Sequence, residues 1–245
     1  FEQMGMKEII QVTQQLEMEL RNRFLTLYYS EMGRRYEKFD SFSESACIYV
    51  VRSVFDRPLQ SAYPLSAYQR EIQVGAALTK ERICELTDDT GETISERNRQ
   101  FCELTALYWI WKNAGEDIVG LEHYRRHFLL QEDWYQKMRV NRIDVILPTP
   151  LYVAPSLAQN YRDRHMASDW EYMMDCLRRI HPGDYKEAVT FFETNLYSPC
   201  NMFIMKREVL DALCTWLFPI LFVCAEHGGE RDDLYQNRYP GFLAE

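Results

Sequence analysis

The sequence predicts an α/β fold, and the order of its apolar segments is the main reason. Short apolar runs typical of strands occur at residues 46–51, 117–121, 143–147 and 201–205. Longer segments with helical spacing of apolar residues alternate with them, at residues 101–113, 169–179, 185–193 and 207–225. Such alternation favours α/β architecture. With 245 residues, 47% of them hydrophobic, the chain can bury the core of one large domain or two small ones.

In the first half of the chain each predicted element has a local signal. Residues 46–51 (ACIYVV) form a β-branched run, which indicates a buried first strand. A loop with Pro58 and Pro64 follows, and then a short apolar segment, 72–78. Residues 86–91 (LTDDTG) have the composition of a turn, and they precede a strong helix from Phe101 to Asn113.

The second half repeats the alternation. Residues 117–121 are predicted as a strand, and residues 143–147 as another that stops at Pro148. Two helices, 169–179 and 185–193, precede the strand from Asn201 to Met205, and a helix from Arg207 to Ala225 follows it. The longest apolar run, 216–225, is shorter than the roughly 18 residues of a membrane span, so it is predicted as part of a core helix.

An N-terminal helical extension is expected ahead of this domain. Apolar residues from Ile9 to Leu27 recur every three or four positions, which predicts one helix over residues 6–39. Residues 41–45 form a polar linker. The predicted division is therefore an extension or linker from an upstream module, 1–44, and a main domain, 45–245. The start at Phe1 and the apolar turn next to Glu245 favour a fragment that is truncated at its carboxyl end.

Composition excludes some functions and favours a compartment. The formal charge of -9 argues against a nucleic-acid-binding surface, which would be basic, although a local basic pocket is compatible with it. The seven cysteines are scattered without a C-x-x-C pair, so a zinc ribbon is unsupported. Their odd number suits reduced thiols, and together with the lack of a signal peptide this favours a cytoplasmic protein.

One short stretch carries most of the chemical interest. Residues 119–128 (VGLEHYRRHF) place a carboxylate, two histidines and two arginines at the end of an apolar run, in a chain of negative net charge. Strand ends in α/β proteins are where anionic ligands are held, so Arg125 and Arg126 are candidate ligands of an anion. The alternative is a solvated run of charges.

Six segments in order resemble one family, the bacterial domain of unknown function 4422 of capsular and O-antigen polysaccharide loci. They are IQVGAAL (72–78), DDTGETISERN (88–98), ELTALYWIWKN (103–113), VGLEHYRRHF (119–128), NMFIMKRE (201–208) and GFLAE (241–245). The resemblance, from about residue 46 to the end, implies a GT-A-like nucleotide-sugar-binding fold, a Rossmann-like sheet flanked by helices. It also implies a cytoplasmic glycosyltransferase, with peripheral association at the inner face of the membrane left open.

The implied reaction transfers a hexose, such as galactose or galactofuranose, from a nucleoside diphosphate sugar, expected to be UDP-linked. The acceptor would be a polysaccharide or a lipid-linked glycan. The alternative is a non-catalytic module that binds a glycan or a partner enzyme during polysaccharide assembly; a phosphatase or nucleotide hydrolase ranks last because no nucleophile motif is present.

Three departures from the expected pattern affect this interpretation. The family usually has V-A-H after the first strand, and this chain has Val51-Arg52-Ser53. The family usually continues past G-F-x-x-E, and this chain stops at Glu245. No D-x-D motif, the metal site of many GT-A enzymes, occurs anywhere in the sequence. Magnesium or manganese is therefore not favoured as a cofactor, because Glu122 with His123 would supply only one carboxylate.

In place of a metal, the cluster after the strand is predicted to bind the donor. Two guanidiniums can neutralise a leaving diphosphate through bidentate charge-assisted hydrogen bonds. The predicted nucleotide-sugar site therefore contains His123, Tyr124, Arg125 and Arg126. At an individual arginine, packing of its stem and pairing with an acid such as Asp117 is the alternative.

The resemblance adds further donor-site residues, each with a structural alternative: Asp88, Asp89, Asn98, Glu103 and Asn201. Asp88 and Asp89 could instead form an Asx-type turn that caps the next element. Glu103 lies in the first turn of the predicted helix, where the helix dipole stabilises a carboxylate. Asn201 could bind a sugar hydroxyl or satisfy local backbone.

Three residues are candidates for catalysis: His165, Asp233 and Glu245. Direct displacement needs a general base for the acceptor hydroxyl, which His165 or a carboxylate such as Asp233 could provide. His165 and Asp169 have the i, i+4 spacing that would place them on one helix face. A carboxylate beside the sugar is the role considered for Glu245. The alternatives are a capping or surface histidine and an exposed terminal acid.

Overall fold

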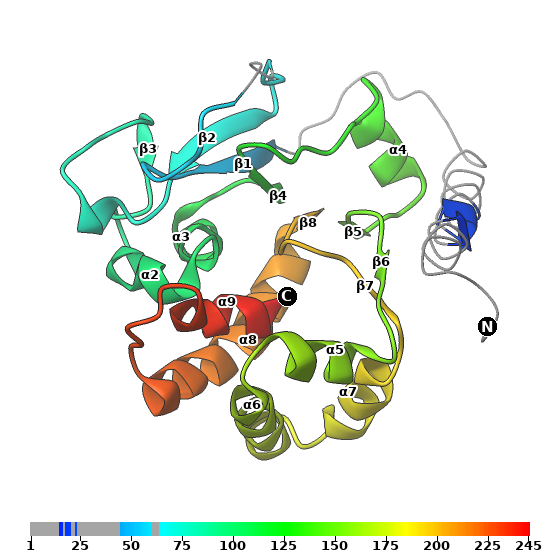
Figure 1. The fold of residues 1–245 in the computed structure, drawn as a ribbon. Coiled ribbons are helices and arrows are strands. Elements are labelled where there is room, and N and C mark those ends of the chain that lie inside the picture. Colours follow the sequence, from blue (N-terminus) through cyan, green and yellow to red (C-terminus); the bar gives the residue numbers. More distant parts are fainter. Residues whose placement is uncertain (1–14, 17, 21–22, 24–44, 60–63) are drawn as a thin grey trace.

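The computed structural model describes residues 15–16, 18–20, 23, 45–59 and 64–245 (Figure 1). Of the predicted N-terminal helix, the described positions 15–16, 18–20 and 23 are helical and exposed. The rest of that prediction lies outside the described residues, and the division into 1–44 and 45–245 stays a prediction.

A six-stranded sheet forms the centre, in the order β3-β2-β1-β4-β8-β5. Its parallel part contains β1 (Ala46–Arg52), β2 (Gln69–Gln73), β3 (Leu86–Thr87) and β4 (Ile118–His123). β8 (Phe203–Lys206) runs antiparallel to both of its neighbours, β4 and β5 (Val145–Ile146). The predicted α/β architecture is confirmed, with a mainly parallel sheet between helices.

Two of the three strands predicted in the second half are shorter than expected, and for one of them the structure shows the cause. β8 begins at Phe203 rather than Asn201 because Cys200 and Asn201 have φ of 73° and 50°, values outside the β region. The predicted strand 143–147 is reduced to its central residues, Val145 and Ile146.

The central strands β1 and β4 are buried on both faces, which explains their nearly continuous apolar sequence. In β1, Tyr49 and Val51 point into a large cluster formed with α3 (Leu104–Asn113) and α8 (Arg207–Gly228). Ile48, directly before Tyr49, points into a smaller cluster on the other face, formed with α4 (Trp134–Val140). This period of two is what a strand between two helical layers requires.

The predicted helix 101–113 is interrupted, so the structure has α2 (Asn98–Phe101) and α3 in its place. Cys102 lies between them with φ of 49°, a left-handed value that ends one helix and redirects the chain. A 3-10 turn, η2 (Ser95–Arg97), leads into α2. Near the end of the chain, η3 (Gln236–Arg238) leads into α9 (Tyr239–Ala244), which packs on α2 and α8.

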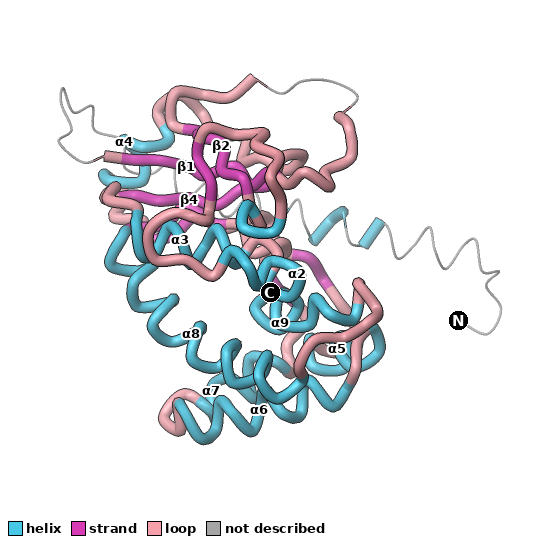
Figure 2. The backbone as a smooth tube through the Cα atoms, turned by 90° about the vertical axis from the view of Figure 1, so that its left-hand side faces the viewer, coloured by secondary structure: helices cyan, strands magenta, loops and turns pink. Residues whose placement is uncertain are grey.

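A third apolar cluster lies at the opposite end of the molecule from the sheet (Figure 2). It is built from α5 (Leu157–Arg164), α6 (Ala167–Ile180) and α7 (Tyr185–Phe192), with the second half of α8. A short antiparallel pair, β6 (Leu151–Tyr152) with β7 (Leu196–Tyr197), connects this helical region to the sheet.

Helix α8 joins the two ends of the molecule. It is long and apolar enough, by length and composition, to cross a membrane. In the structure, however, Leu210 and Phe218 are buried in the sheet cluster, and Ile220 and Cys224 are buried in the helical cluster. Helix α8 is therefore a core helix, as predicted for its apolar run.

The centre of the sheet predicts a steric test at Gly120 of β4. A Cβ atom there would lie 3.1 Å from side-chain carbons of both Ile48 and Ile204. We expect Gly120→Val to lower the free energy of unfolding by about 1–3 kcal/mol, the usual cost of overpacking. Gly183→Val is the control, because a Cβ at Gly183 meets nothing within 4 Å. Urea denaturation of both variants measures the difference; equal stability would contradict the packing described for β4.

Candidate functional site

The carboxyl ends of β1, β2, β3 and β4 lie on one edge of the sheet because these strands are parallel. The chain continues the pairing for one residue past each strand end. Val74 N–H donates to the Arg52 carbonyl, Asp88 N–H to the Gln73 carbonyl, and Tyr124 N–H to the Val51 carbonyl. Ligands of open α/β sheets bind at such an edge, so this edge is the candidate location of the functional site.

A tight turn follows β4 at this edge. His123 and Arg126 exchange backbone hydrogen bonds of 3.2 and 3.1 Å, which closes the turn over Tyr124 and Arg125. Arg125 and Arg126 are exposed, and neither forms an ion pair with any described residue. The Arg125 guanidinium carbon lies 5.5 Å from the centre of the Tyr124 ring. The predicted pairing of an arginine with Asp117 is not seen, since Asp117 instead accepts hydrogen bonds from Ser45.

The buried carboxylate of Glu122 fixes the backbone that follows the turn. Glu122 is fully buried and accepts hydrogen bonds from Phe128 N–H and Gln69 Nε2, both at 2.6 Å. Its other contact is His127 Nδ1, at 3.0 Å. Successive residues of a strand point to opposite faces, so His123 points away from Glu122. The Glu122–His123 metal pair considered from the sequence is therefore wrong.

The loop before β8 closes over the end of β4. His123 Nε2 donates to the Cys200 carbonyl at 2.7 Å, and Cys200 N–H donates to the Glu245 carboxylate. Asn201 Nδ2 donates to Glu103 Oε1 at 2.8 Å. Four of the predicted site residues, from four separate segments, thus meet at this loop.

The cationic and the anionic side chains of the predicted site both affect the Cys200 thiol. Burial raises the pKa of this thiol, and the nearby Arg126 and Arg125 cations lower it, while the Glu245 and Glu103 carboxylates raise it. Cys200 and Asn201 hold left-handed backbone angles, which for residues other than glycine are costly and cluster at functional sites. The loop therefore lies near both the cationic turn and the two carboxylates.

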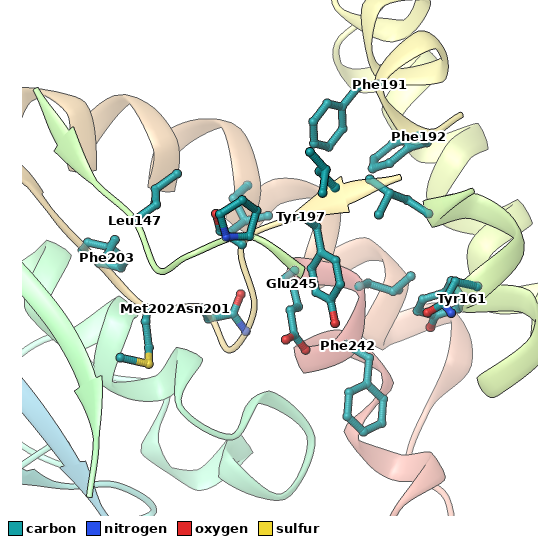
Figure 3. Close-up of a pocket in the computed structure, with 18 of the residues that line it drawn as sticks. Leu147, Tyr161, Phe191, Phe192, Tyr197, Asn201, Met202, Phe203, Phe242 and Glu245 are labelled. Carbon is teal, nitrogen blue, oxygen red and sulfur yellow. The ribbon is translucent and has the colours of Figure 1, made fainter. Parts of the chain in front are cut away.

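Beyond this loop is a cavity of about 520 Å³, walled by α5, α7, α8, β8 and α9. Figure 3 shows the Glu245 carboxylate and the Tyr197 ring near its middle, with Phe191 and Phe192 above them and Leu147 and Phe203 to one side. Asn201 also lines the cavity. The same loop therefore borders the cavity and the arginine turn.

His165 lines the cavity but is not on a helix face with Asp169. It caps the end of α5, and Asp169 lies in α6, so their predicted shared face is wrong. Asp169 is paired with Arg231, with N–O distances of 2.8 and 2.5 Å. The His165 ring stacks on Phe242 at 4.3 Å, and its Nδ1 atom is buried without a hydrogen-bond partner in the described structure. Burial, helped by the neighbouring Arg164 cation, lowers the pKa of His165 against the opposing effect of Asp169, so the ring is neutral at pH 7.

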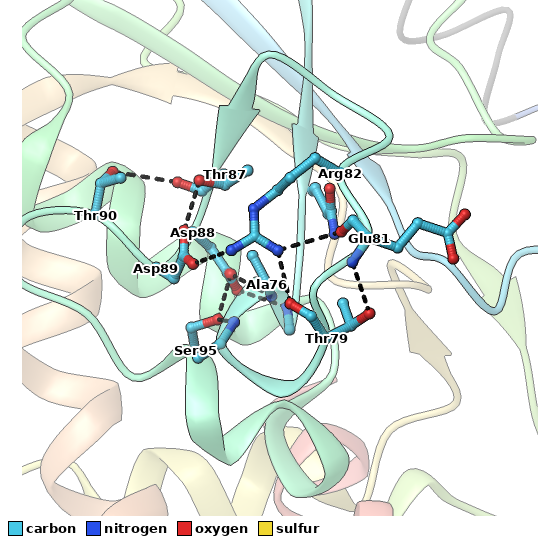
Figure 4. Close-up of polar contacts among 12 residues, drawn as sticks. Ala76, Thr79, Glu81, Arg82, Thr87, Asp88, Asp89, Thr90 and Ser95 are labelled. Atoms are coloured by element: carbon cyan, nitrogen blue, oxygen red, sulfur yellow. Dashed lines mark hydrogen bonds and ion pairs between the residues drawn. The ribbon is translucent and has the colours of Figure 1, made fainter.

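The predicted donor residue Asp88 is structural instead. It is fully buried, and its two oxygens accept four hydrogen bonds, from Gly75 N–H, Ala76 N–H and the hydroxyls of Ser95 and Thr105 (Figure 4). All four acceptor positions of the carboxylate are filled, so none remains for a ligand. The direct donor contact predicted for Asp88 is therefore wrong, and its role is to hold the ends of β2 and β3 to the helices.

Two neighbours of Asp88 take part in the same framework. Asn98 donates to the Cys102 carbonyl at 2.7 Å and to Thr105 Oγ1 at 3.0 Å, and its side chain fills the space beside Gly75. Asp89 is partly buried, pairs with Arg82 at 2.8 Å and accepts a hydrogen bond from the Thr87 hydroxyl at 2.6 Å. Ligand contacts by Asn98 and Asp89 stay predictions.

Asp233 is the one predicted catalytic residue that the structure does not bring to the cavity. It is exposed, and its Oδ1 accepts hydrogen bonds from Tyr235 and Gln236 N–H, which caps η3. Sequence reasoning also missed lining residues, among them Tyr161, Arg164, Tyr197 and Ser198. For Arg164 a signal existed, since it stands directly before His165; for the others the sequence carries none.

Removing the Asp88 carboxylate tests its structural role. In Asp88→Ala the buried Gly75 and Ala76 N–H groups lose their acceptor, and each unsatisfied group costs about 1–3 kcal/mol. We expect the free energy of unfolding to fall by about 2–5 kcal/mol, measured by urea denaturation. Asp89→Ala removes a half-exposed ion pair and should cost about 1 kcal/mol or less. Equal effects in the two variants would contradict the role given to Asp88.

Comparison with known proteins agrees with this architecture. The chain is similar to a solved structure of WbbM, described as a bifunctional glycosyltransferase in its apo form, with 27% sequence identity and a TM-score of 0.69. The match covers 82% of this chain and 40% of that chain, so the chain spans less than half the length of this relative. No curated protein matches it. The likeness and the mainly parallel six-stranded sheet confirm the predicted GT-A-like fold. The family described as a domain of unknown function (DUF4422) matches residues 59–245, and the chain belongs to this family.

Proposed function

We propose that this chain is a glycosyltransferase domain. In this proposal it transfers a hexose, such as galactose or galactofuranose, from a UDP-linked donor to a glycan acceptor, either a polysaccharide or a lipid-linked glycan. The observation that carries the proposal is two exposed arginines at the carboxyl edge of the sheet, without an ion-pair partner among the described residues. One loop separates them from a cavity that contains a carboxylate. Membership of the family and the likeness to a glycosyltransferase support it.

The donor diphosphate would bind at the turn of Arg125 and Arg126. Both guanidiniums are exposed and have no acidic partner among the described residues, so binding a diphosphate breaks no ion pair. Guanidinium–phosphate hydrogen bonds are charge-assisted and bidentate, and they strengthen as charge develops on the leaving group. His123 and Glu122 hold the turn on either side, so the arginines start from a fixed backbone.

A metal-assisted mechanism fits the residues at this edge poorly. Magnesium and manganese prefer carboxylate oxygens, whereas the turn presents two guanidiniums and an imidazole. Glu103 and Glu245 already accept hydrogen bonds from the loop. Within the described part of the chain, no group of three or more histidine, cysteine, aspartate or glutamate side chains is arranged for a metal ion. No step of the proposed reaction passes through a metal.

The acceptor would enter from the cavity side. Glu245 and His165 both line the cavity, and either can take the proton of an attacking hydroxyl. The lowered pKa of His165 keeps its ring neutral and able to accept a proton at pH 7. Asp233, already engaged in capping η3, is the weakest of the three candidates.

The setting follows from the same proposal. All seven cysteines are free, which supports a reducing compartment such as the cytoplasm. Peripheral contact with the inner face of a membrane and an upstream module in a longer protein are part of the proposal. The alternative, a non-catalytic module that binds a glycan or partner enzyme, is favoured by one observation: Glu103, Asn201 and Glu245 all hold the loop rather than standing free.

The arginine turn gives the sharpest test. In Arg125→Ala/Arg126→Ala, loss of two charge-assisted contacts of about 1.5–3 kcal/mol each should reduce transfer about 100-fold or more. UDP at 100 times its Kd should stabilise the wild-type protein by about 2.7 kcal/mol, and that thermal shift should disappear in the variant. The control is Arg178→Ala/Arg179→Ala, an adjacent exposed pair on α6, away from the sheet edge. Transfer that survives in the first variant would reject the clamp and favour the binding module.

Removal of metal tests the chemistry separately. Because the turn neutralises the diphosphate with guanidiniums, we expect transfer to continue at an undiminished rate in EDTA. The assay compares initial rates of transfer with and without the chelator. Complete loss of activity, restored by added Mn²⁺, would overturn the metal-free clamp while leaving the assignment as a glycosyltransferase intact.

A further inference from the structure

The cavity next to Glu245 is much less polar than a sugar site requires. On the side of the sheet and α8, its wall consists of apolar side chains, including Leu107, Phe203, Leu213 and Leu217. None of these can hydrogen-bond to a hydroxyl group. Burying a sugar against this wall would strip its hydroxyls of water without replacement, which costs free energy. A hydrocarbon would gain free energy at the same place.

The polar groups of the cavity gather on other segments. They are contributed by the end of α5, by the loop before β8 and by the last residue: Asn160, Arg164, His165, Ser198, Asn201 and Glu245. His165 Nδ1 and the Tyr161 hydroxyl are buried without a hydrogen-bond partner in the described structure. Arg164 forms no ion pair with a described residue. The cavity is therefore amphipathic, with unsatisfied polar groups in part of its lining only.

The mouth of the cavity is apolar and open to solvent. Three of its lining residues keep about half of their surface exposed: Leu147 at 51%, Phe191 at 52% and Leu196 at 47%. Isolated exposed apolar side chains are common, but a group of them at the entrance of an apolar cavity marks a binding site. The volume of about 520 Å³ is in the range of small-molecule pockets.

We propose that this cavity binds the hydrocarbon chain of an amphipathic acceptor, with the sugar of that acceptor beside Glu245 and Asn201. That the bound molecule is an acceptor of the transfer reaction rests on the proposed function. The binding of a hydrocarbon chain in the cavity does not depend on it. It narrows the acceptor from any glycan to a glycan that carries an alkyl or polyprenyl-like chain. It also assigns a binding role to residues 191–198, which none of the sequence motifs contained.

Tryptophan fluorescence can test binding without any transfer reaction. Trp170 and Trp216 line the cavity, and the other three tryptophans of the chain do not. An alkyl glycoside brominated in its chain, kept below its micelle concentration, should quench the wild-type emission saturably. Among unbrominated competitors, affinity should rise up to about fourfold for each added methylene. Trp170→Phe/Trp216→Phe should lose the quenching.

A negative charge introduced at the mouth of the cavity can be compared with one introduced nearby, outside the cavity lining. Phe191→Asp should weaken binding of the alkyl glycoside at least tenfold, whereas Val189→Asp, on the same helix but outside the cavity lining, should not. Both positions are partly exposed, so both variants should fold. The UDP-induced thermal shift should be unchanged in both, because neither residue lies at the arginine turn.

The outcomes separate this inference from the proposed function. Quenching that is absent, or equally reduced in the two α7 variants, would overturn the inference. The inference would also be overturned if the protein did not bind the glycoside but formed a concentration-dependent dimer that Phe191→Asp abolishes. A second copy of the chain would then be the occupant of the cavity. If affinity rises with the length of the alkyl chain but no donor supports transfer, the binding role of the cavity is supported and the glycosyltransferase proposal is rejected.

Discussion

The candidate site depends on one buried strand, β4, which is paired with β1 on one side and β8 on the other. The close approach of these strands at Gly120 leaves no room for a side chain between Ile48 and Ile204. Because β4 is fixed on both edges, its last residue, His123, has one position and can hold the Cys200 carbonyl. The arginine turn and the loop before β8 are thus two consequences of the same strand pairing.

Much of the fold could be predicted from the sequence, because strands and helices leave local signals. The β-branched run at 46–51 and the long apolar helix after Arg207 are both found close to their predicted bounds. The interruption at Cys102 and the late start of β8 could not be predicted, since both depend on left-handed backbone angles at residues that are not glycine. Nothing in a side chain such as cysteine announces that conformation.

For the site, the structure brings several of the predicted residues together and gives others structural contacts. Glu103 and Asn201 are 98 positions apart, and their contact exists only in the folded chain. Asp88 shows the opposite error. It lies in a motif that resembles the family, but its carboxylate accepts hydrogen bonds from donors inside the domain. A pattern of residue types cannot distinguish an acid that meets a ligand from an acid that meets four internal donors.

The loop of residues 198–201 lies near the charged side chains of the candidate site and also lines the cavity. A transfer reaction must bring a departing anion and an incoming nucleophile to the same reacting carbon. Here the cations of Arg125 and Arg126 and the carboxylates of Glu103 and Glu245 all act on the same thiol, Cys200, with opposite signs. A protein of net charge -9 would repel a sugar diphosphate in general, so the two exposed guanidiniums of the arginine turn supply the local positive charge that would attract one. Glu103 and Glu245 each accept a hydrogen bond from this loop, so the left-handed backbone at Cys200 and Asn201 also fixes where these two carboxylates lie.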